Sequence, residues 1–332
     1  MRILFKIAKL TLITLSILVL LLFLLFYRPD IALNRLEDKY FTEFSNYYTA
    51  MIQDLEDRDL EINIHYMDIG SEHDTVIVLL HGAFSSSHTF LPWAYELESL
   101  GYRILLIDLP YHGLSSGFID HVTSIRRSAA VVKNLLDHLE IQQIYIGGNS
   151  MGGGVSWMFT GLYHGELFQV QGVILIDAIF PSDRSGRPEG FSLLTQPLVS
   201  KIASQMTPKF LLNWILQGVY GSQSSLDQET LTRYYELLRR EGNRLAILRN
   251  TQEIIELEQQ ILILNRLKDE SIPILIMWGE EDSWIPVEVA TLFKEQLSLA
   301  DESIVIYAGL GHVPMEEDPL RTLYDLILFL NQ

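Results

Sequence analysis

The feature that most limits how this chain can fold is a series of short apolar runs that alternate with helical segments. Successive positions within each run are apolar, which predicts strands buried on both faces. A sheet covered on both faces is typical of parallel strands joined by crossover helices. The runs lie at residues 75–82, 103–110, 144–150, 173–178, 274–279 and 303–309.

Helical patterns separate these runs and complete the alternation that a doubly wound sheet requires. They cover residues 89–101, 122–140, 151–165 and the C-terminal residues from about 320. Residues 62–70 alternate apolar and polar side chains, which indicates one further strand. We therefore expect an α/β protein in which residues 60–332 form a doubly wound, mostly parallel sheet.

The alternation is interrupted between residues 178 and 271, where no convincing strand pattern occurs. Helical patterns rich in Leu, Ile and Phe fill the interval, together with Trp214. This composition predicts a helical cap inserted above the sheet, at about residues 180–270. An ordinary packed core between the cap helices explains the apolar residues as well as a substrate-binding surface does.

The N-terminal residues 1–28 differ from the rest of the chain. Residues 10–27 form an uncharged run of 18 residues, and a helix of that length spans roughly 27 Å, about the thickness of a bilayer's hydrocarbon core. The run ends in Phe26 and Tyr27 without the small residues of a signal-peptide cleavage site. We therefore predict an uncleaved membrane anchor over residues 1–28, followed by a juxtamembrane linker or helix over residues 29–59.

The charges around this run predict its orientation. Arg2, Lys6 and Lys9 precede it, and the first 29 residues contain no Asp or Glu. Basic residues favour the cytoplasmic side of a membrane. We expect a single-pass protein with a cytoplasmic N-terminus and an extracytoplasmic main domain.

The overall composition excludes several kinds of function. The net charge is −18 at pH 7, which argues against nucleic acid as a partner because phosphate binding needs clustered Lys and Arg. The chain has no cysteine, so it has no disulfide, no thiol nucleophile and no thiolate metal site.

The strongest local motif is G-x-S-x-G, formed by Gly148, Ser150 and Gly152. An apolar strand pattern precedes it and a helical pattern follows at once, which is the setting of a nucleophile elbow. A sharp turn there raises the serine hydroxyl above the sheet beside a helix N-terminus. The other interpretation, a glycine-rich phosphate-binding turn, lacks both the lysine of a P-loop and the G-x-G-x-x-G spacing.

A serine hydroxyl needs a base, and the base needs an acid that orients it. His312 follows the last predicted strand and is the candidate base. Asp282 lies a few residues after the strand 274–279 and is the preferred acid, because of its order in the chain and its place in a loop between that strand and a helix. Asp177, at the end of the strand 173–178, is the competing acid.

An oxyanion hole needs backbone amides directed at the developing charge. The amide of Met151, which follows the nucleophile, is the first candidate. The loop after the strand 75–82 should supply the second, from Ala83 or, as the second choice, Phe84. His81 precedes the serine in the chain and is interpreted as a structural residue of that loop.

With these residues placed, the chain resembles the α/β-hydrolase superfamily over about residues 60–332. Within it, the chain is similar to monoacylglycerol-lipase-like and esterase-like members, and to the meta-cleavage-product C–C hydrolases. The resemblance implies a Ser150–His312–Asp282 triad, oxyanion amides from Ala83 and Met151, and no cofactor. The segments that carry it are LLHGAFSSSHTF, DLPYHGLSS, GGNSMGG, MWGEEDSWIP and GLGHVPMEEDP.

Three functions follow as hypotheses. The preferred one is a serine hydrolase of carboxylic esters, apolar or lipid-derived, with Phe84 and Trp214 lining the substrate site. The second is hydrolysis of a C–C bond in an acidic diketone, for which Arg184, Arg187 or Arg233 of the cap would bind the carboxylate. The third is an inactive hydrolase fold that serves as a binding module. The first two need no metal.

Overall fold

The computed structural model describes residues 2–165, 167–182, 196–249, 251–252 and 255–332. An eight-stranded sheet forms its centre, with the strand order β1-β2-β4-β3-β6-β7-β9-β10. Strands β1 and β2 pair antiparallel, as do β2 and β4, and all other neighbours are parallel. The mostly parallel, doubly wound sheet predicted from the sequence is thereby confirmed.

Every apolar run singled out in the sequence forms a strand of this sheet. The strands are β1 (Ser45–Gln53), β2 (Asp59–Ile69), β3 (Val76–Leu80), β4 (Arg103–Ile107), β6 (Gln143–Asn149), β7 (Gln169–Ile176), β9 (Ile274–Gly279) and β10 (Ile304–Tyr307). Strands β5 (Val122–Thr123) and β8 (Thr251–Gln252) pair separately as a small two-stranded sheet.

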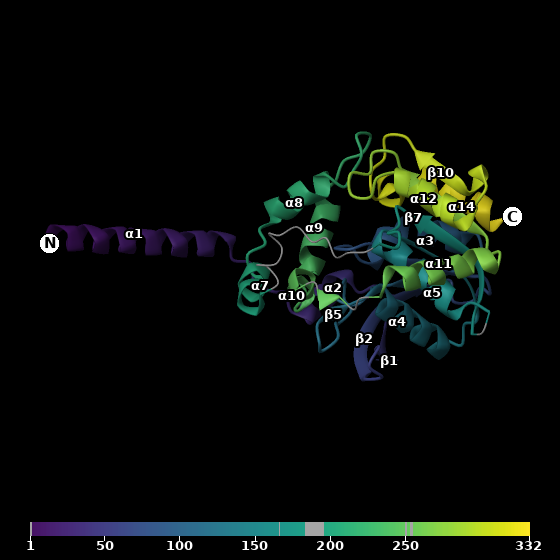
Figure 1. Cartoon of the computed structure of the whole chain (residues 1–332), viewed down its shortest axis with the longest axis horizontal. Coiled ribbons are helices and arrows are strands. Elements are labelled where there is room, and N and C mark those ends of the chain that lie inside the picture. The colour runs from purple at the N-terminus through teal and green to yellow at the C-terminus, as the bar shows by residue number, and fades with distance from the viewer. Residues whose placement is uncertain (1, 166, 183–195, 250, 253–254) are drawn as a thin grey trace.

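Helices cover both faces of the large sheet (Figure 1). Alternate side chains of β3 explain the two layers: Val78 belongs to one buried cluster and Ile77 to the other. The first cluster includes α4 (Ile125–His138), α5 (Met151–Tyr163), α11 (Leu257–Asp269) and α12 (Glu288–Leu297). The second includes η1 (Ser87–Phe90), α3 (Leu91–Ser99), α13 (Pro314–Glu317) and α14 (Pro319–Leu330). The short helix η2 (Asp301–Ser303) precedes β10.

Between β7 and β9 the described chain is mainly helical. Four helices lie on the side of the body nearest α1 (Figure 1): α7 (Pro197–Ser204), α8 (Lys209–Gln217), α9 (Gln228–Leu238) and α10 (Asn243–Arg249). Helix α11 instead packs on the sheet layer, and Gly161 of α5 lies so close to the Ile263 carbonyl that no side chain would fit there. Arg184 and Arg187, the first two cap arginines considered, lie outside the described residues.

The segment 29–59 differs from the expected linker or helix. It contains helix α2 (Leu33–Tyr40) and also the nine-residue edge strand β1. Strand β1 pairs along its whole length with β2, from Ser45 opposite Met67 to Gln53 opposite Asp59. The polar composition of the segment is explained by its position, because an edge strand exposes alternate residues to solvent.

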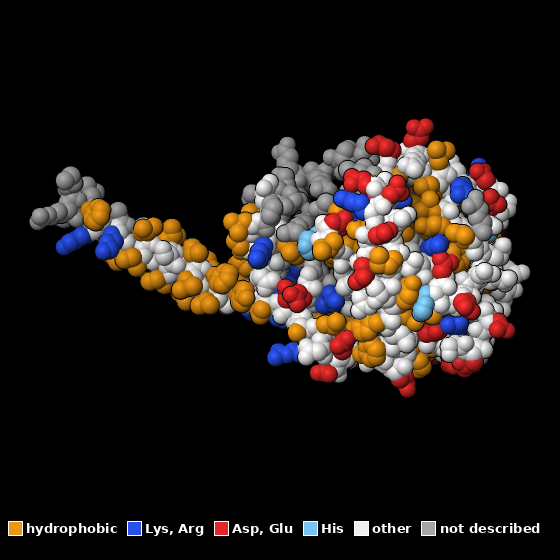
Figure 2. Space-filling view, turned by 90° about the horizontal axis from the view of Figure 1, so that it is seen from below, with side chains coloured by type: hydrophobic (Ala, Val, Ile, Leu, Met, Phe, Trp, Pro, Cys, Tyr) orange, Lys and Arg blue, Asp and Glu red, His pale blue; other side chains and the backbone are white. Residues whose placement is uncertain are grey.

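Helix α1 (Arg2–Phe26) extends away from the body of the molecule (Figure 1). Its stretch Phe5–Phe26 has 22 residues and a mean hydropathy of 2.6, and it is not buried against the rest of the described chain. Figure 2 shows mainly hydrophobic side chains along it. This helix is long and apolar enough to be a membrane anchor. An N-terminal signal sequence can have the same length and composition.

Candidate active site

Ser150 lies at the sharp turn between β6 and α5. Its backbone has φ 54° and ψ −114°, a conformation that non-glycine residues rarely adopt. Its amide donates to the Ile176 carbonyl of β7 over 2.9 Å, which holds the turn against the neighbouring strand. A side chain at Gly152 would overlap the Leu80 carbonyl, so the turn requires glycine at that position. These are the geometric features expected of a nucleophile elbow.

His312 lies in the loop after β10 and is held there by its backbone. Its amide donates to the Val219 carbonyl over 2.7 Å. Its carbonyl accepts from the Asn149 side-chain amide over 2.8 Å. Because Asn149 directly precedes Ser150, this bond places the histidine loop beside the elbow.

Asp282 lies in the loop after β9 and pairs with the imidazole of His312. The distance from Oδ2 to Nδ1 is 2.7 Å, and both side chains are buried. Oδ1 accepts from the amides of Trp284 (2.7 Å) and Ile285 (3.0 Å), which fixes the carboxylate. An ionised carboxylate only accepts hydrogen bonds, so Nδ1 carries the proton and Nε2 is left as an acceptor.

Asp177 is a second carboxyl beside this pair. It follows β7, is fully buried, and has φ 43°. Its Oδ1 accepts from the Gly279 amide over 3.0 Å, and its Oδ2 has no hydrogen-bond partner among the described residues. Burial, and then the negative charge of Asp282, raise the pKa of Asp177 well above its ordinary value. Both effects favour the protonated form of Asp177.

The loop after β3 approaches the elbow closely. A side chain at Gly82 would come within 2.6 Å of Asn149 Oδ1 and 3.2 Å of Ser150 Cβ. His81 is buried in this loop, with Nδ1 donating to the Gly82 carbonyl (2.8 Å) and Nε2 accepting from the Leu109 amide (2.9 Å). Both ring nitrogens are thus used to hold the loop, and burial lowers the pKa of His81.

The two candidate oxyanion donors flank the elbow. Met151 begins α5, and Ala83 follows Gly82 in the approaching loop. Within the described part of the chain, neither amide donates a hydrogen bond to another protein group. Amides in this state are available to a bound oxygen atom.

The two predicted substrate-binding residues lie in different places. The Phe84 ring meets Trp284 edge to face at 6.2 Å, and the Trp284 ring lies 5.5 Å from that of His312. Trp214 lies on α8, is 72% exposed, and makes no hydrogen bond or ring contact with the site in the described part of the chain. The cap residue Arg233 forms an ion pair with Glu316 at 2.8 Å.

Two positioning residues were not anticipated from the sequence. Asn149 occupies a variable position of the motif, yet its amide reaches the histidine loop. Glu317 accepts from the amides of Gly311 (2.8 Å) and Gly221 (2.7 Å), which joins the histidine loop to the segment after α8. Burial raises the pKa of Glu317. The only trace in the sequence was the acidic run after His312.

Two sets of described side chains have donor atoms within 4.8 Å of one another, close enough to share an ion. Asp177, Asp282 and His312 form the first set, but the histidine and one aspartate already bond each other. Glu72, His73 and Glu98 form the second, which is partly exposed. The first set lies beside the elbow, because the Asn149 side chain bonds the His312 carbonyl, and serine, histidine and carboxyl groups are those that acyl transfer uses.

Comparison with known proteins adds the following matches. The sequence matches the model of a family described as "Serine aminopeptidase, S33" over residues 71–319. A 2-hydroxy-6-oxononadienedioate/2-hydroxy-6-oxononatrienedioate hydrolase of Pseudomonas putida is 24% identical over 275 residues, or 80% of this chain and 90% of that protein.

Two solved structures align over most of their length. An esterase from Thermogutta terrifontis gives a TM-score of 0.63 at 19% identity, covering 86% of this chain and 98% of its own. A membrane phospholipase A, described as a bacterial virulence factor, gives a TM-score of 0.61 at 21% identity, covering 99% of this chain and 98% of its own. At these identities the likeness concerns the fold alone.

Proposed function

This chain belongs to the serine aminopeptidase S33 family and has the α/β-hydrolase fold, and from that premise we propose that it hydrolyses carboxylic esters with Ser150 as its nucleophile. The observation that carries the proposal is the 2.7 Å hydrogen bond between His312 and Asp282, in a loop tied to the residue before Ser150. This arrangement leaves Nε2 of the imidazole available to accept a proton.

The proposed mechanism is acyl transfer to water. The Ser150 hydroxyl attacks the ester carbonyl while His312 takes its proton, and the amides of Ala83 and Met151 stabilise the oxyanion. His312 then protonates the departing alcohol. Water, deprotonated by His312, attacks the acyl-enzyme and releases the acid and Ser150. Asp282 keeps the imidazole in the required tautomer and stabilises its charged form.

We propose further that the substrate is an apolar or lipid-derived ester and that α1 anchors the enzyme in a membrane. The exposed apolar stretch Phe5–Phe26 supports the anchor, with the N-terminus in the cytoplasm and the catalytic domain on the other side. Phe84 and Trp284 support an apolar acyl group, because the Trp284 ring lies next to His312 and the Phe84 ring packs against Trp284. Trp214 belongs to the proposal only as an outer residue of the cap.

The test is the Ser150→Ala variant, with Ser99→Ala as its control because Ser99 is an exposed serine on α3. We expect the rate on p-nitrophenyl esters to fall at least ~10⁴-fold for Ser150→Ala and to be unchanged for Ser99→Ala. A fluorophosphonate probe should label the wild-type chain at Ser150 only. Full hydrolysis by Ser150→Ala would refute the proposal, and failure of the folded wild type to label would favour an inactive binding module.

A C–C hydrolase is the second candidate, because the similar protein of Pseudomonas putida is named for such a substrate. Its acidic substrate needs a cation, and the described cap arginine considered for this role, Arg233, is already paired with Glu316. Rates on a 2-hydroxy-6-oxo dienedioate, on esters of graded chain length and on an amino-acid anilide separate the possibilities. We expect the medium or long esters to be fastest.

A further inference from the structure

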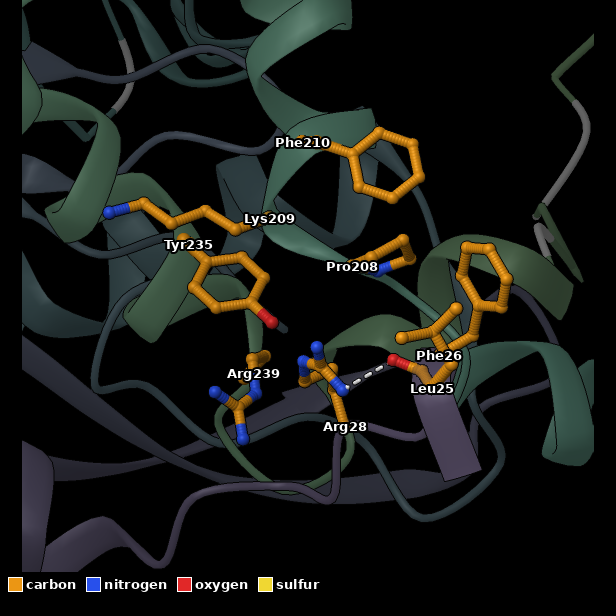
Figure 3. A pocket seen from close by; sticks show the side chains of 8 residues that line it. All are labelled: Leu25, Phe26, Arg28, Pro208, Lys209, Phe210, Tyr235 and Arg239. Atoms are coloured by element: carbon orange, nitrogen blue, oxygen red, sulfur yellow. Dashed lines mark hydrogen bonds between the residues drawn. The ribbon is translucent and has the colours of Figure 1, made fainter. Parts of the chain in front are cut away.

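A pocket lies where α1 meets the body of the molecule, away from the proposed catalytic residues. Its volume is about 360 Å³. Figure 3 shows it between the end of α1 and side chains from the region of α8 and α9. It is lined by Leu25, Phe26, Arg28, Pro208, Lys209, Phe210, Tyr235 and Arg239.

Two guanidinium groups of the pocket have no carboxylate partner in the described part of the chain. Arg28 donates to the carbonyls of Leu25 (2.9 Å) and Tyr27 (2.8 Å). Arg239 donates to the Pro29 carbonyl over 2.7 and 3.1 Å. Because Pro29 directly follows Arg28, the two cations belong to one small region. In a chain with a net charge of −18, two adjacent cations paired only with carbonyls form an anion-binding surface.

The hydroxyl of Tyr235 is an independent sign of a ligand. Tyr235 is only 7% exposed, and its Oη atom has no hydrogen-bond partner among the described residues. Figure 3 shows this hydroxyl directed into the pocket, and the Arg239 guanidinium lies 5.0 Å from the Tyr235 ring. A buried hydroxyl without a hydrogen-bond partner costs free energy. A bound ligand that forms a hydrogen bond with the Tyr235 hydroxyl would remove this cost.

Apart from Lys209, whose ammonium donates to Thr232, the remaining wall of the pocket is apolar and is continuous with α1. The rings of Phe26 and Phe210 lie 6.0 Å apart, edge to face. Phe210 is 64% exposed, and Trp214 on the same helix is 72% exposed. Figure 2 shows hydrophobic side chains on the body where α1 joins it. Arg28 comes two residues after the apolar stretch, which is the depth at which lipid headgroups lie.

We propose that this pocket binds the anionic headgroup of a membrane phospholipid. Arg28, Arg239 and the Tyr235 hydroxyl contact the phosphate, and an acyl chain lies along Phe26 and Phe210. The apolar wall favours a lipid over free phosphate, because free phosphate has nothing to bury against it. The inference rests on the proposed anchoring by α1 and is independent of the proposed chemistry at Ser150.

The experiment uses the full chain in a non-ionic detergent. Native mass spectrometry measures how tightly it binds phospholipids. We expect phosphatidylglycerol to bind at least tenfold more tightly than phosphatidylcholine. Arg239→Gln should weaken phosphatidylglycerol binding by roughly fivefold. Tyr235→Phe should weaken it too without lowering the unfolding temperature, because the lost hydroxyl has no protein partner. The matched controls Arg35→Gln and Tyr95→Phe, at exposed positions, should bind like the wild type.

Three results would overturn the proposal: equal affinity for the two lipids, an equal loss in the controls, or full displacement of phosphatidylglycerol by millimolar inorganic phosphate. Hydrolysis of a short, soluble ester by the same variants keeps this test separate from the proposed function. We expect Arg239→Gln and Tyr235→Phe to retain that activity, and Ser150→Ala to retain lipid binding.

Discussion

Two carboxyl groups lie beside His312, and their surroundings differ. Asp282 accepts two backbone amides and the imidazole of His312. Asp177 is fully buried, accepts one amide, and faces the charge of Asp282, which favours the protonated form. The two carboxyls therefore differ in their partners: Asp282 bonds the imidazole, and Asp177 is a buried neighbour whose protonated form is favoured.

The first prediction compares conservative amide variants of the two acids. Asp282→Asn should lower kcat on a p-nitrophenyl ester by ~10³ to 10⁴-fold, because the imidazole loses the group that sets its tautomer. Asp177→Asn should keep kcat within about tenfold. The opposite ranking would assign the role of the catalytic acid to Asp177, which follows β7.

The second prediction concerns stability at Asp177. Since its pKa is raised in the folded protein, the unfolded chain loses this proton above about pH 4 while the folded chain keeps it. Wild-type stability therefore falls with rising pH until the folded pKa is reached, by up to about 1.4 kcal/mol per pH unit. The asparagine side chain in Asp177→Asn does not titrate. The unfolding free energy of this variant, relative to that of the wild type, should therefore increase between pH 4 and pH 8. Denaturant unfolding at several pH values measures this, and a constant difference would contradict it.

At the scale of elements, the strand–turn–helix unit from β6 to α5 depends on close backbone contact. A side chain at Gly152 would overlap the Leu80 carbonyl of β3, and neither backbone can move without disturbing the sheet. A side chain at Gly218, after α8, would meet only a carbonyl at 3.4 Å. The two glycines thus provide a matched pair.

The third prediction uses this pair. Gly152→Ala should destabilise the protein by about 3 kcal/mol or more, since overpacking of a rigid core cannot relax. Gly218→Ala should change the unfolding free energy by less than about 1 kcal/mol. Thermal and urea unfolding of both variants provide the measurement. Wild-type stability in Gly152→Ala would show that the elbow is looser than these contacts imply.

At the scale of the whole molecule, buried histidines make stability depend on pH. Burial lowers the pKa of His88 to about 4 and that of His112 to about 3. Below the ordinary value of 6.5 the unfolded chain binds protons that the folded chain does not. The stability these groups contribute is present above pH 6.5 and is lost as the pH falls toward their folded values.

The fourth prediction follows from that sign. Between pH 7 and pH 5 the wild type should lose about 2 kcal/mol of unfolding free energy for each such histidine. His88→Gln, which can still donate to the Tyr40 carbonyl that His88 contacts at 3.0 Å, should show a shallower loss. Ser99→Ala, at an exposed position that does not titrate, should keep the wild-type slope. Equal slopes in all three proteins would contradict the assignment.

Much of the fold was predictable because each buried parallel strand is a run of consecutive apolar residues, a pattern that is visible locally in the sequence. Each apolar run formed a strand, and the serine motif fell between β6 and α5 as expected. Strand β1 was missed because it is an edge strand rich in polar and aromatic residues and has no such apolar run. The roles of Ser150, Asp282, His312, Ala83 and Met151 stay predictions, to which the structure adds distances.

The sequence by itself determined the order of strands and helices, the turn at Ser150 and the apolar character of residues 10–27, because each depends on neighbours within a few positions. Only the tertiary structure decided that Asn149 contacts His312, 163 residues away, and that Tyr235 meets the end of α1. Such contacts depend on how distant elements pack, and no local pattern encodes which side chains then meet.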